Sequence, residues 1–253
     1  NFDKSYQYIT SPHQLDKRPS QTMLADLHTE AITSLLEGRE EEGIQRFHEC
    51  LALAKTWCDH GIPQQEQELS TAMEDDAVEP NIFEISIDGT IDPDSQFGCS
   101  HRADVAVSMN LYRNIFGTDG LYTIKDKATL LQMVSVISFN LGITFHERGL
   151  VCGETTLLAR ARSLYGFSLR LVDSDKTQAG QLDLSTLELA LLNNLWHVSA
   201  FFLDFESLAK YRERMLARLA SVQPESVCEI DFFRKNCLSS LDLPTVGAFA
   251  PAA

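Results

Sequence analysis

The sequence predicts a mainly α-helical protein, built as an irregular stack of about three helical hairpins with a small β-hairpin insertion. Three observations support this fold class. Apolar residues recur at three-and-four spacing on both sides of Gly38, between residues 21 and 60. The same period returns from residue 127 onward, and residues 81–87 between the two regions alternate as a strand does. With 253 residues, 44% of them hydrophobic, the chain can bury a sizeable core.

The first third of the chain predicts one helical hairpin between two polar segments. Residues 1–20 are polar, contain Pro12 and Pro19 and show no sustained period, which predicts an extended N-terminal arm. Residues 21–60 form the first helical hairpin, with Gly38 at its turn. Residues 61–80 are rich in Gln, Glu and Asp and are predicted to be an acidic linker.

Residues 81–120 are predicted to form the β-hairpin insertion. The run from Asn81 to Ile87 alternates and is rich in β-branched residues, and Asp88-Gly89 supplies turn chemistry after it. A second strand is expected over Val105–Tyr112. Residues 103–116 also fit a helical pattern, so both interpretations of this segment stay open.

Residues 127–241 are predicted to contain two further helical hairpins and a capping helix. The first hairpin joins a helix ending at Gly149 to a partner helix over residues 157–172. The second joins residues 184–203 to residues 205–222. A short helix over residues 225–241 covers the open end of the stack, and residues 242–253 form an unstructured tail.

The small and aromatic residues of these hairpins resemble those of a tetratricopeptide repeat. In the first hairpin Gly43 follows the turn and Phe47 stands four residues later. In the second, Asn140-Leu141-Gly142 to Gly149 resembles the first helix of the repeat, and Ala161 with Tyr165 matches its second helix. A small residue lets one helix press on its neighbour, and the aromatic fills the next groove. The third hairpin departs from the pattern, because Trp196 replaces the Gly.

Asn140 and Asn194 each stand directly before the Leu of the motif. In tetratricopeptide proteins an Asn at that place often faces the concave groove and hydrogen-bonds the backbone of a bound peptide, so the resemblance implies this role here. An amide offers both a donor and an acceptor, which suits an extended main chain. The alternative is that each Asn bonds only its neighbours in the stack. In the first hairpin that place holds Thr29.

Helical spacing extends the predicted partner-binding groove beyond the two asparagines. Ile143 and Glu147 share the helix face of Asn140, and His197 and Phe201 share the face of Asn194.

No motif in the sequence predicts catalysis, a metal site or a cofactor. His48 and Cys50 are of ligand type, but residues two apart on a helix point away from one another. The acidic run Asp88–Asp94 fails the residue order of a calcium loop. Phosphate-binding Gly-rich loops, a Gly-x-Ser-x-Gly elbow and a His-Glu-x-x-His pair do not occur.

The net charge indicates which kind of partner to expect, and the cysteine pattern indicates the redox state of the cell compartment. A formal net charge of −15 repels phosphate backbones, so we expect a neutral or basic protein or peptide partner and no nucleic acid. The six cysteines form no Cys-x-x-Cys pair, which favours the cytoplasm or another reducing intracellular compartment. The longest apolar candidate, Leu187–Leu203, is interrupted by polar residues, so membrane insertion is not expected.

Three function classes follow from the sequence. The first is a non-catalytic protein–protein interaction module, an adaptor or scaffold, that binds a peptide or helix in the concave groove of its helical repeats. The second is a constitutive structural subunit of a larger complex. The third is an enzyme or metal-binding protein, which the missing motifs disfavour.

Overall fold

Seven helices and one two-stranded antiparallel sheet make up the part of the chain that the computed structural model describes, residues 22–63, 82–85, 111–118, 124–175, 184–222 and 230–239. The elements are α1 (Met23–Leu36), α2 (Glu40–His60), β1 (Ile82–Ile85), β2 (Ile115–Thr118), α4 (Lys127–Cys152), α5 (Thr155–Asp175), α6 (Ser185–Phe201), α7 (Phe205–Ser221) and α8 (Ile230–Ser239). The predicted arm at 1–20, nearly all of the 61–80 linker and the tail at 242–253 lie outside the described residues.

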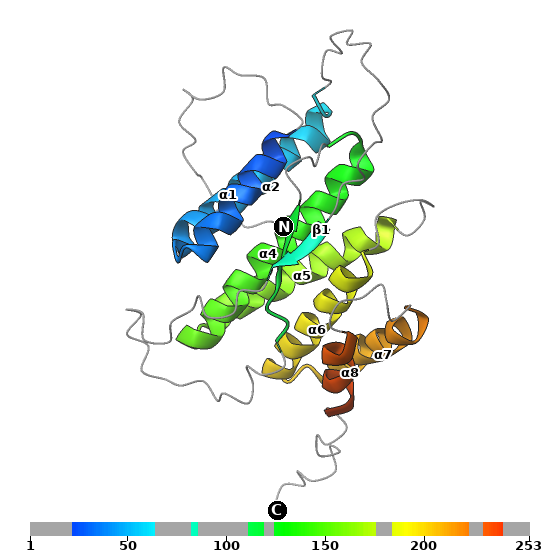
Figure 1. The fold of residues 1–253 in the computed structure, drawn as a ribbon. Helices are drawn as coiled ribbons and strands as arrows, with labels where there is room; N and C mark the ends of the chain where they lie inside the picture. Colours follow the sequence, from blue (N-terminus) through cyan, green and yellow to red (C-terminus); the bar gives the residue numbers. More distant parts are fainter. Residues whose placement is uncertain are drawn as a thin grey trace, which may run out of the picture.

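The helices pack as three hairpins in chain order, as the sequence predicts. Helices α1 and α2, α4 and α5, and α6 and α7 pair with one another, and α2 on α4 and α5 on α6 join the pairs into a stack (Figure 1). Helix α8 packs on α6 and α7 at the end of the stack, where a capping helix is expected. The mainly α fold with a small β-hairpin is therefore confirmed.

Glycines without a Cβ set how closely the helices approach. A Cβ on Gly142 of α4 would lie 2.7 Å from Cε1 of Tyr165 on α5. A Cβ on Gly43 of α2 would lie 2.7 Å from Cδ2 of Leu35 on α1. At both positions the sequence predicts a small residue that allows a neighbouring helix to pack closely. Both contacts are possible only because glycine has no Cβ.

The turns differ in one place from the prediction. Gly38 has a φ of 75° in the α1–α2 turn, as expected of a left-handed turn residue. Gly149 was predicted to end the helix, but α4 continues to Cys152 and Gly153, with a φ of 67°, ends it. Gly149 instead lies inside α4, where an added Cβ would come within 2.9 Å of the Leu158 side chain. Close packing therefore explains this glycine.

The sheet contains the predicted first strand and a second strand further along the chain than predicted. β1 pairs antiparallel with β2, with Ile82 opposite Thr118 and Ile85 opposite Ile115. Most of the predicted strand at 105–112 lies outside the described residues; residues 111–114 form no regular structure, and the paired strand begins only at Ile115. The helical alternative for residues 103–116 is wrong for residues 111–116, the part of it that the structure describes. Tertiary contacts of this segment, described below, place the strand.

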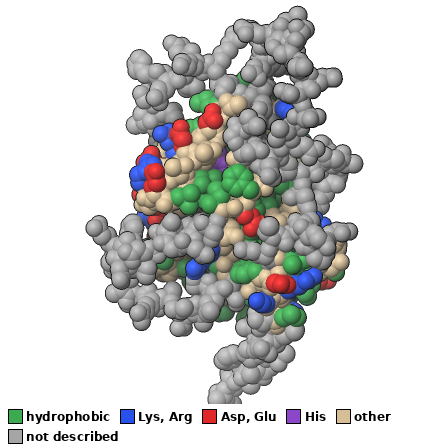
Figure 2. Space-filling model, viewed as in Figure 1, with side chains coloured by type: hydrophobic (Ala, Val, Ile, Leu, Met, Phe, Trp, Pro, Cys, Tyr) green, Lys and Arg blue, Asp and Glu red, His purple; other side chains and the backbone are tan. Residues whose placement is uncertain are grey.

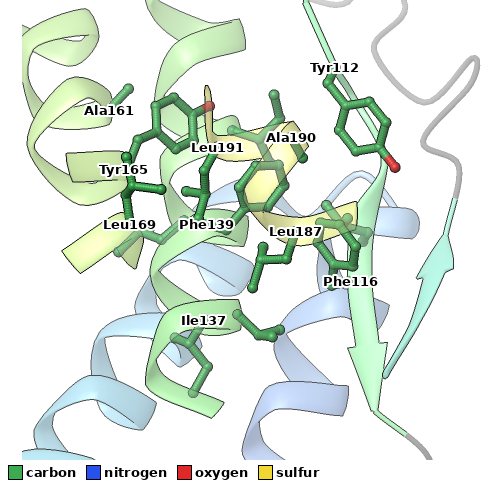
Figure 3. Close-up of a cluster of buried hydrophobic side chains, with 14 of the residues drawn as sticks. Tyr112, Phe116, Ile137, Phe139, Ala161, Tyr165, Leu169, Leu187, Ala190 and Leu191 are labelled. Carbon is green, nitrogen blue, oxygen red and sulfur yellow. The ribbon is translucent and has the colours of Figure 1, made fainter. Parts of the chain in front are cut away.

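Helix α4 forms the centre of the core (Figure 3). Phe139 of α4, Tyr165 of α5 and Leu187 of α6 meet there with Tyr112 and Phe116 from the segment at β2. Among the described helices, α4 is the one long and apolar enough to span a membrane, a property that the sequence prediction did not assign to it. Its most apolar window of 18 residues is 83% buried inside the protein.

Ion pairs tie the last helices together. The buried carboxylate of Glu188 on α6 lies 2.8 Å from Arg214 and 3.0 Å from Arg218, both on α7. Arg214 also pairs with Asp173 on α5, so one guanidinium links three helices.

Charges of both signs also lie side by side on the surface of the α1–α2 hairpin, where Arg39 pairs with Glu37 and Glu42 (Figure 2).

Candidate peptide-binding groove

The first helices of the three hairpins face a short extended stretch of the same chain. This stretch, residues 111–118, is called the inner segment below; it includes β2. Helices α1 and α4 pack against β2, and α6 bonds the backbone of Tyr112 at the other end. Such a row of first helices is the face that the sequence predicts as a groove, and in this structure the inner segment occupies it.

Asn140 of α4 holds the inner segment at Phe116. Its Oδ1 accepts a hydrogen bond from the Phe116 N–H at 2.9 Å, and its Nδ2 donates to the Phe116 carbonyl at 2.8 Å. The side-chain amide thus pairs with both main-chain groups of one residue, as a neighbouring β-strand would. Asn140 is fully buried, so these bonds form away from water.

Asn194 of α6 repeats the arrangement four residues earlier in the segment. Its Oδ1 accepts from the Tyr112 N–H at 3.0 Å, and its Nδ2 donates to the Tyr112 carbonyl at 3.0 Å. Asn193 donates to the same Oδ1 at 3.2 Å, and Asn236 of α8 donates to Asn193 at 2.8 Å. This row of amides orients Asn194 and links the capping helix to the groove.

A charge pair holds the inner segment between the two asparagines. Arg113 Nε lies 3.4 Å from Glu147 Oε1, with the carboxylate side chain 12% exposed and the arginine 46% exposed. Burial raises the pKa of Glu147 to about 7, while Arg113 acts in the opposite direction. A basic residue at this position of a bound chain therefore offsets part of the cost of a buried carboxylate.

Aromatic side chains of the inner segment fill apolar sites on the helices. The Tyr112 ring stacks on Phe233 of α8 with centroids 5.0 Å apart and meets Phe232 edge-on at 5.7 Å. Phe116 meets Phe139 of α4 edge-on at 5.2 Å. Tyr112, Phe116 and Ile115 between them are all buried. The segment is therefore recognised by its side chains as well as by its main chain.

Behind Asn194 lies a buried chain of polar groups with one consistent set of donors and acceptors. Asn194 Nδ2 is 3.4 Å from the Tyr165 hydroxyl, which is 3.3 Å from His146 Nδ1. His146 Nε2 is 3.0 Å from His197 Nδ1. If Asn194 donates to Tyr165 and Tyr165 to His146, then His146 donates onward through Nε2 to His197. Burial lowers the pKa of His146, which fits this neutral ring.

In the first hairpin the groove position belongs to His28. Its Nε2 lies 3.0 Å from Asn140 Nδ2 and accepts the second amide proton. Burial lowers the pKa of His28 to about 3, so the ring is a neutral acceptor. Thr29, to which the sequence motif assigns this place, is exposed, and its hydroxyl donates to the Ala25 carbonyl of its own helix.

The predicted groove residues divide into two sets. Asn140, Glu147 and Asn194 contact the inner segment, so the structure brings them together on one face. Ile143 is fully buried in the core, His197 is buried against His146, and Phe201 is 39% exposed beside Phe202. Whether a partner protein binds this face stays a prediction, because the chain itself covers the asparagines here.

Sequence reasoning missed the residues that the groove holds. Tyr112, Arg113 and Phe116 carry no motif, and His28 lies one position away from the residue that the repeat pattern indicates. The alternation that ends at Tyr112 was a usable sign of extended structure. Nothing in the spacing of the chain shows that this stretch returns to helices 24 and 82 residues away.

His48 and Cys50, two neighbouring side chains of ligand type on α2, both pack against other parts of the protein. Within residues 22–63 and the other described ranges, no three His, Cys, Asp or Glu side chains lie close enough to hold a metal ion. Cys50 is fully buried, and burial raises the pKa of its thiol, while His48 lies against Phe145 with ring centroids 6.3 Å apart. These groups serve the core of the α1–α2 and α4 packing.

Comparison of this chain with protein-family models, with curated proteins and with solved structures found no match.

Proposed function

We propose that this protein is a non-catalytic protein-interaction module whose groove grips an extended polypeptide by its main chain. The proposal depends on the paired hydrogen bonds of the Asn140 and Asn194 side-chain amides. Each amide bonds the main-chain N–H and C=O of one residue, and these groups are present whatever the side chain of that residue. The resemblance to tetratricopeptide repeats implies the same use of such asparagines. The inner segment is then the occupant of the groove in the free protein.

The electrostatics favour a neutral or basic partner. The net charge of −15 attracts basic chains, and Glu147 places an acidic side chain in the groove beside Arg113. Module function also fits the buried polar groups behind Asn194, because Tyr165, His146 and His197 lie within hydrogen-bonding distance of one another, and burial lowers the pKa of His146. An adaptor or scaffold role follows from such a module.

Affinity capture with the full chain tests the groove. The Asn140→Ala/Asn194→Ala variant removes both amide pairs, and Gln45→Ala, an exposed amide on α2, is the matched control. We expect partners from the source cell to be captured by the wild type and the control and lost with the double variant. Circular dichroism confirms that each protein is folded. Undiminished capture by a folded double variant overturns the groove assignment.

One observation favours the second candidate, a permanent subunit of a larger assembly. The turn between α6 and α7 exposes large apolar side chains: Leu203 is 70% exposed, Phe205 60% and Phe201 39%. A permanent subunit needs such a face covered, so the isolated chain would self-associate or melt at low temperature. Size-exclusion chromatography with light scattering separates the two, since an adaptor is expected to be a soluble monomer with cooperative unfolding.

A further inference from the structure

We propose that the inner segment is an internal copy of the partner sequence, so that the groove selects an extended peptide of the form aromatic–Arg–polar–aliphatic–aromatic. This inference rests on the proposed function and deepens it by naming the class of partner. It follows that the partner must displace residues 111–118 to bind, and that the protein is self-occupied until it meets such a sequence.

The register of the motif comes from the two amide pairs. Asn194 bonds residue 112 and Asn140 bonds residue 116, so both pairs act on the same edge of the extended chain. The main chain at 112 and 116 is thereby fixed, and the side chains of these residues enter sites built by Phe233 and Phe139. A peptide that slips by one residue would lose both amide pairs or both ring contacts.

The second and fourth positions are read by different contacts. Arg113 faces Glu147, a carboxylate that is nearly buried and gains from a cation. Ile115 is fully buried, which requires an apolar side chain there. Asn114 at the third position is only half-buried, and its Nδ2 lies 3.4 Å from Oε2 of Glu84 on β1, so a polar side chain suits this position.

The strand β1, which pairs with the outer edge of the inner segment, is short and partly exposed, so a partner peptide could replace the inner segment in the groove. β1 is four residues long, and Phe83, which lies above Gly117, is 42% exposed. Apolar atoms show at the surface in the middle of Figure 2, at the place where Figure 1 draws β1. The helices thus bind one edge and the inward side chains of the segment, and among the described residues the short, half-exposed strand β1 pairs with its other edge.

The inner segment is part of the same chain, so it competes with an added peptide at an effective concentration of about millimolar. Binding of a separate peptide is therefore measurable only when substitutions weaken the hold of the groove on the inner segment. The probe is a fluorescein-labelled peptide of residues 111–118, titrated against the full chain and against the full-length Tyr112→Ala/Phe116→Ala variant. We expect the variant to bind it about tenfold or more tightly than the wild type does. Phe167→Ala/Phe205→Ala, which alters two exposed rings outside the groove, should bind as weakly as the wild type.

Specificity is tested in the peptide. Arg113→Glu in the peptide should weaken binding to the opened variant about tenfold, and this loss should largely disappear when the protein also carries Glu147→Gln. A peptide with both aromatic residues changed to Ala should not bind. Equal binding of all three peptides, or no binding of the parent peptide to a folded opened variant, overturns the proposal.

Amide hydrogen exchange of the unaltered protein keeps the proposal testable if the double variant fails to fold. The main-chain amides of Tyr112 and Phe116 should exchange through an opening of lower free energy than those of residues 139–145 in α4. Exchange of both at the rate of global unfolding would show that the segment is a permanent part of the fold. In that case the proposed peptide motif would be wrong. The groove function itself would still hold if partner capture depends on Asn140 and Asn194.

Discussion

Asn140 and Asn194 are buried amides with every polar atom occupied by a partner. Asn140 bonds both main-chain groups of Phe116 and the ring of His28, and Asn194 bonds Tyr112, Tyr165 and Asn193. A buried polar group costs free energy when its partner is removed, since water cannot replace the lost bond. These two residues therefore support the fold and shape the groove at once.

Asn140→Ala should lower the free energy of unfolding by about 2–4 kcal/mol, because it leaves the Phe116 N–H and C=O and His28 without their buried partner. Urea denaturation followed by circular dichroism measures the change. Gln45→Ala, whose amide is exposed, should change it by less than about 0.5 kcal/mol. Equal effects of the two substitutions would contradict the assigned bonds.

Glu147 predicts a pH dependence of stability. Its pKa is about 7 in the folded protein against 4.5 for an exposed carboxyl, so between these values the folded state keeps a proton that the unfolded state has lost. The free energy of unfolding contributed by this group therefore falls as the pH rises from 4.5 to 7. In the Glu147→Gln variant the decrease in the free energy of unfolding between pH 4.5 and 7 should be smaller by about 2–3 kcal/mol.

Urea melts of wild type and Glu147→Gln at several pH values test this. His28 and His146, whose lowered pKa values make stability rise with pH up to about 6.5, are present in both proteins and cancel in the difference. Parallel curves for the two proteins would show that the Glu147 carboxyl is not desolvated in the folded state.

At the scale of elements, contact between a glycine and a ring fixes the α4–α5 hairpin. Gly142 admits Tyr165, whose hydroxyl lies within hydrogen-bonding distance of Asn194 and His146, so the ring cannot easily move away. Gly166 on α5 differs, because an added Cβ there would meet only the far end of Arg170 at 3.7 Å. The two glycines thus form a matched pair with opposite surroundings.

Gly142→Ala should destabilise the protein by about 1–3 kcal/mol, because the added methyl overlaps a ring held by hydrogen bonds. Gly166→Ala should instead stabilise it by about 0.5–1 kcal/mol, since Ala forms helix more readily and the space is free. Thermal and urea unfolding of both variants measure the difference. A stabilising Gly142→Ala would mean that α4 and α5 do not approach as closely as described.

At the scale of the whole molecule, an excess of negative charge opposes the compact state. The formal net charge is −15, and the ion pairs of Arg214 and Arg39 neutralise it only locally. Added salt screens this repulsion over about 10 Å at 0.1 M.

The melting temperature should therefore rise by a few degrees as sodium chloride increases at pH 7.5, and the rise should nearly vanish close to the isoelectric point of about 4.8. Differential scanning fluorimetry at both pH values measures this. A melting temperature that falls with salt at pH 7.5 would indicate that local ion pairs outweigh the overall repulsion.

The helices were predictable because their signals are local. Three-and-four spacing placed α1, α2 and α4–α7 within a few residues, and Gly43 and Gly142 were predicted as close-contact positions. The end of α4 was misplaced at Gly149, because a glycine that admits Leu158 and a glycine that ends a helix look alike in a sequence.

For the groove, the sequence by itself supplied three polar candidates: the resemblance to a tetratricopeptide repeat implies Asn140 and Asn194, and helical periodicity adds Glu147 to the face of Asn140. Only the tertiary structure decided what they bond. The occupant is residues 111–118, the first-hairpin partner is His28 and not Thr29, and the second strand begins at Ile115. Each of these depends on the chain returning across many residues to satisfy buried amides, and no local pattern records that requirement.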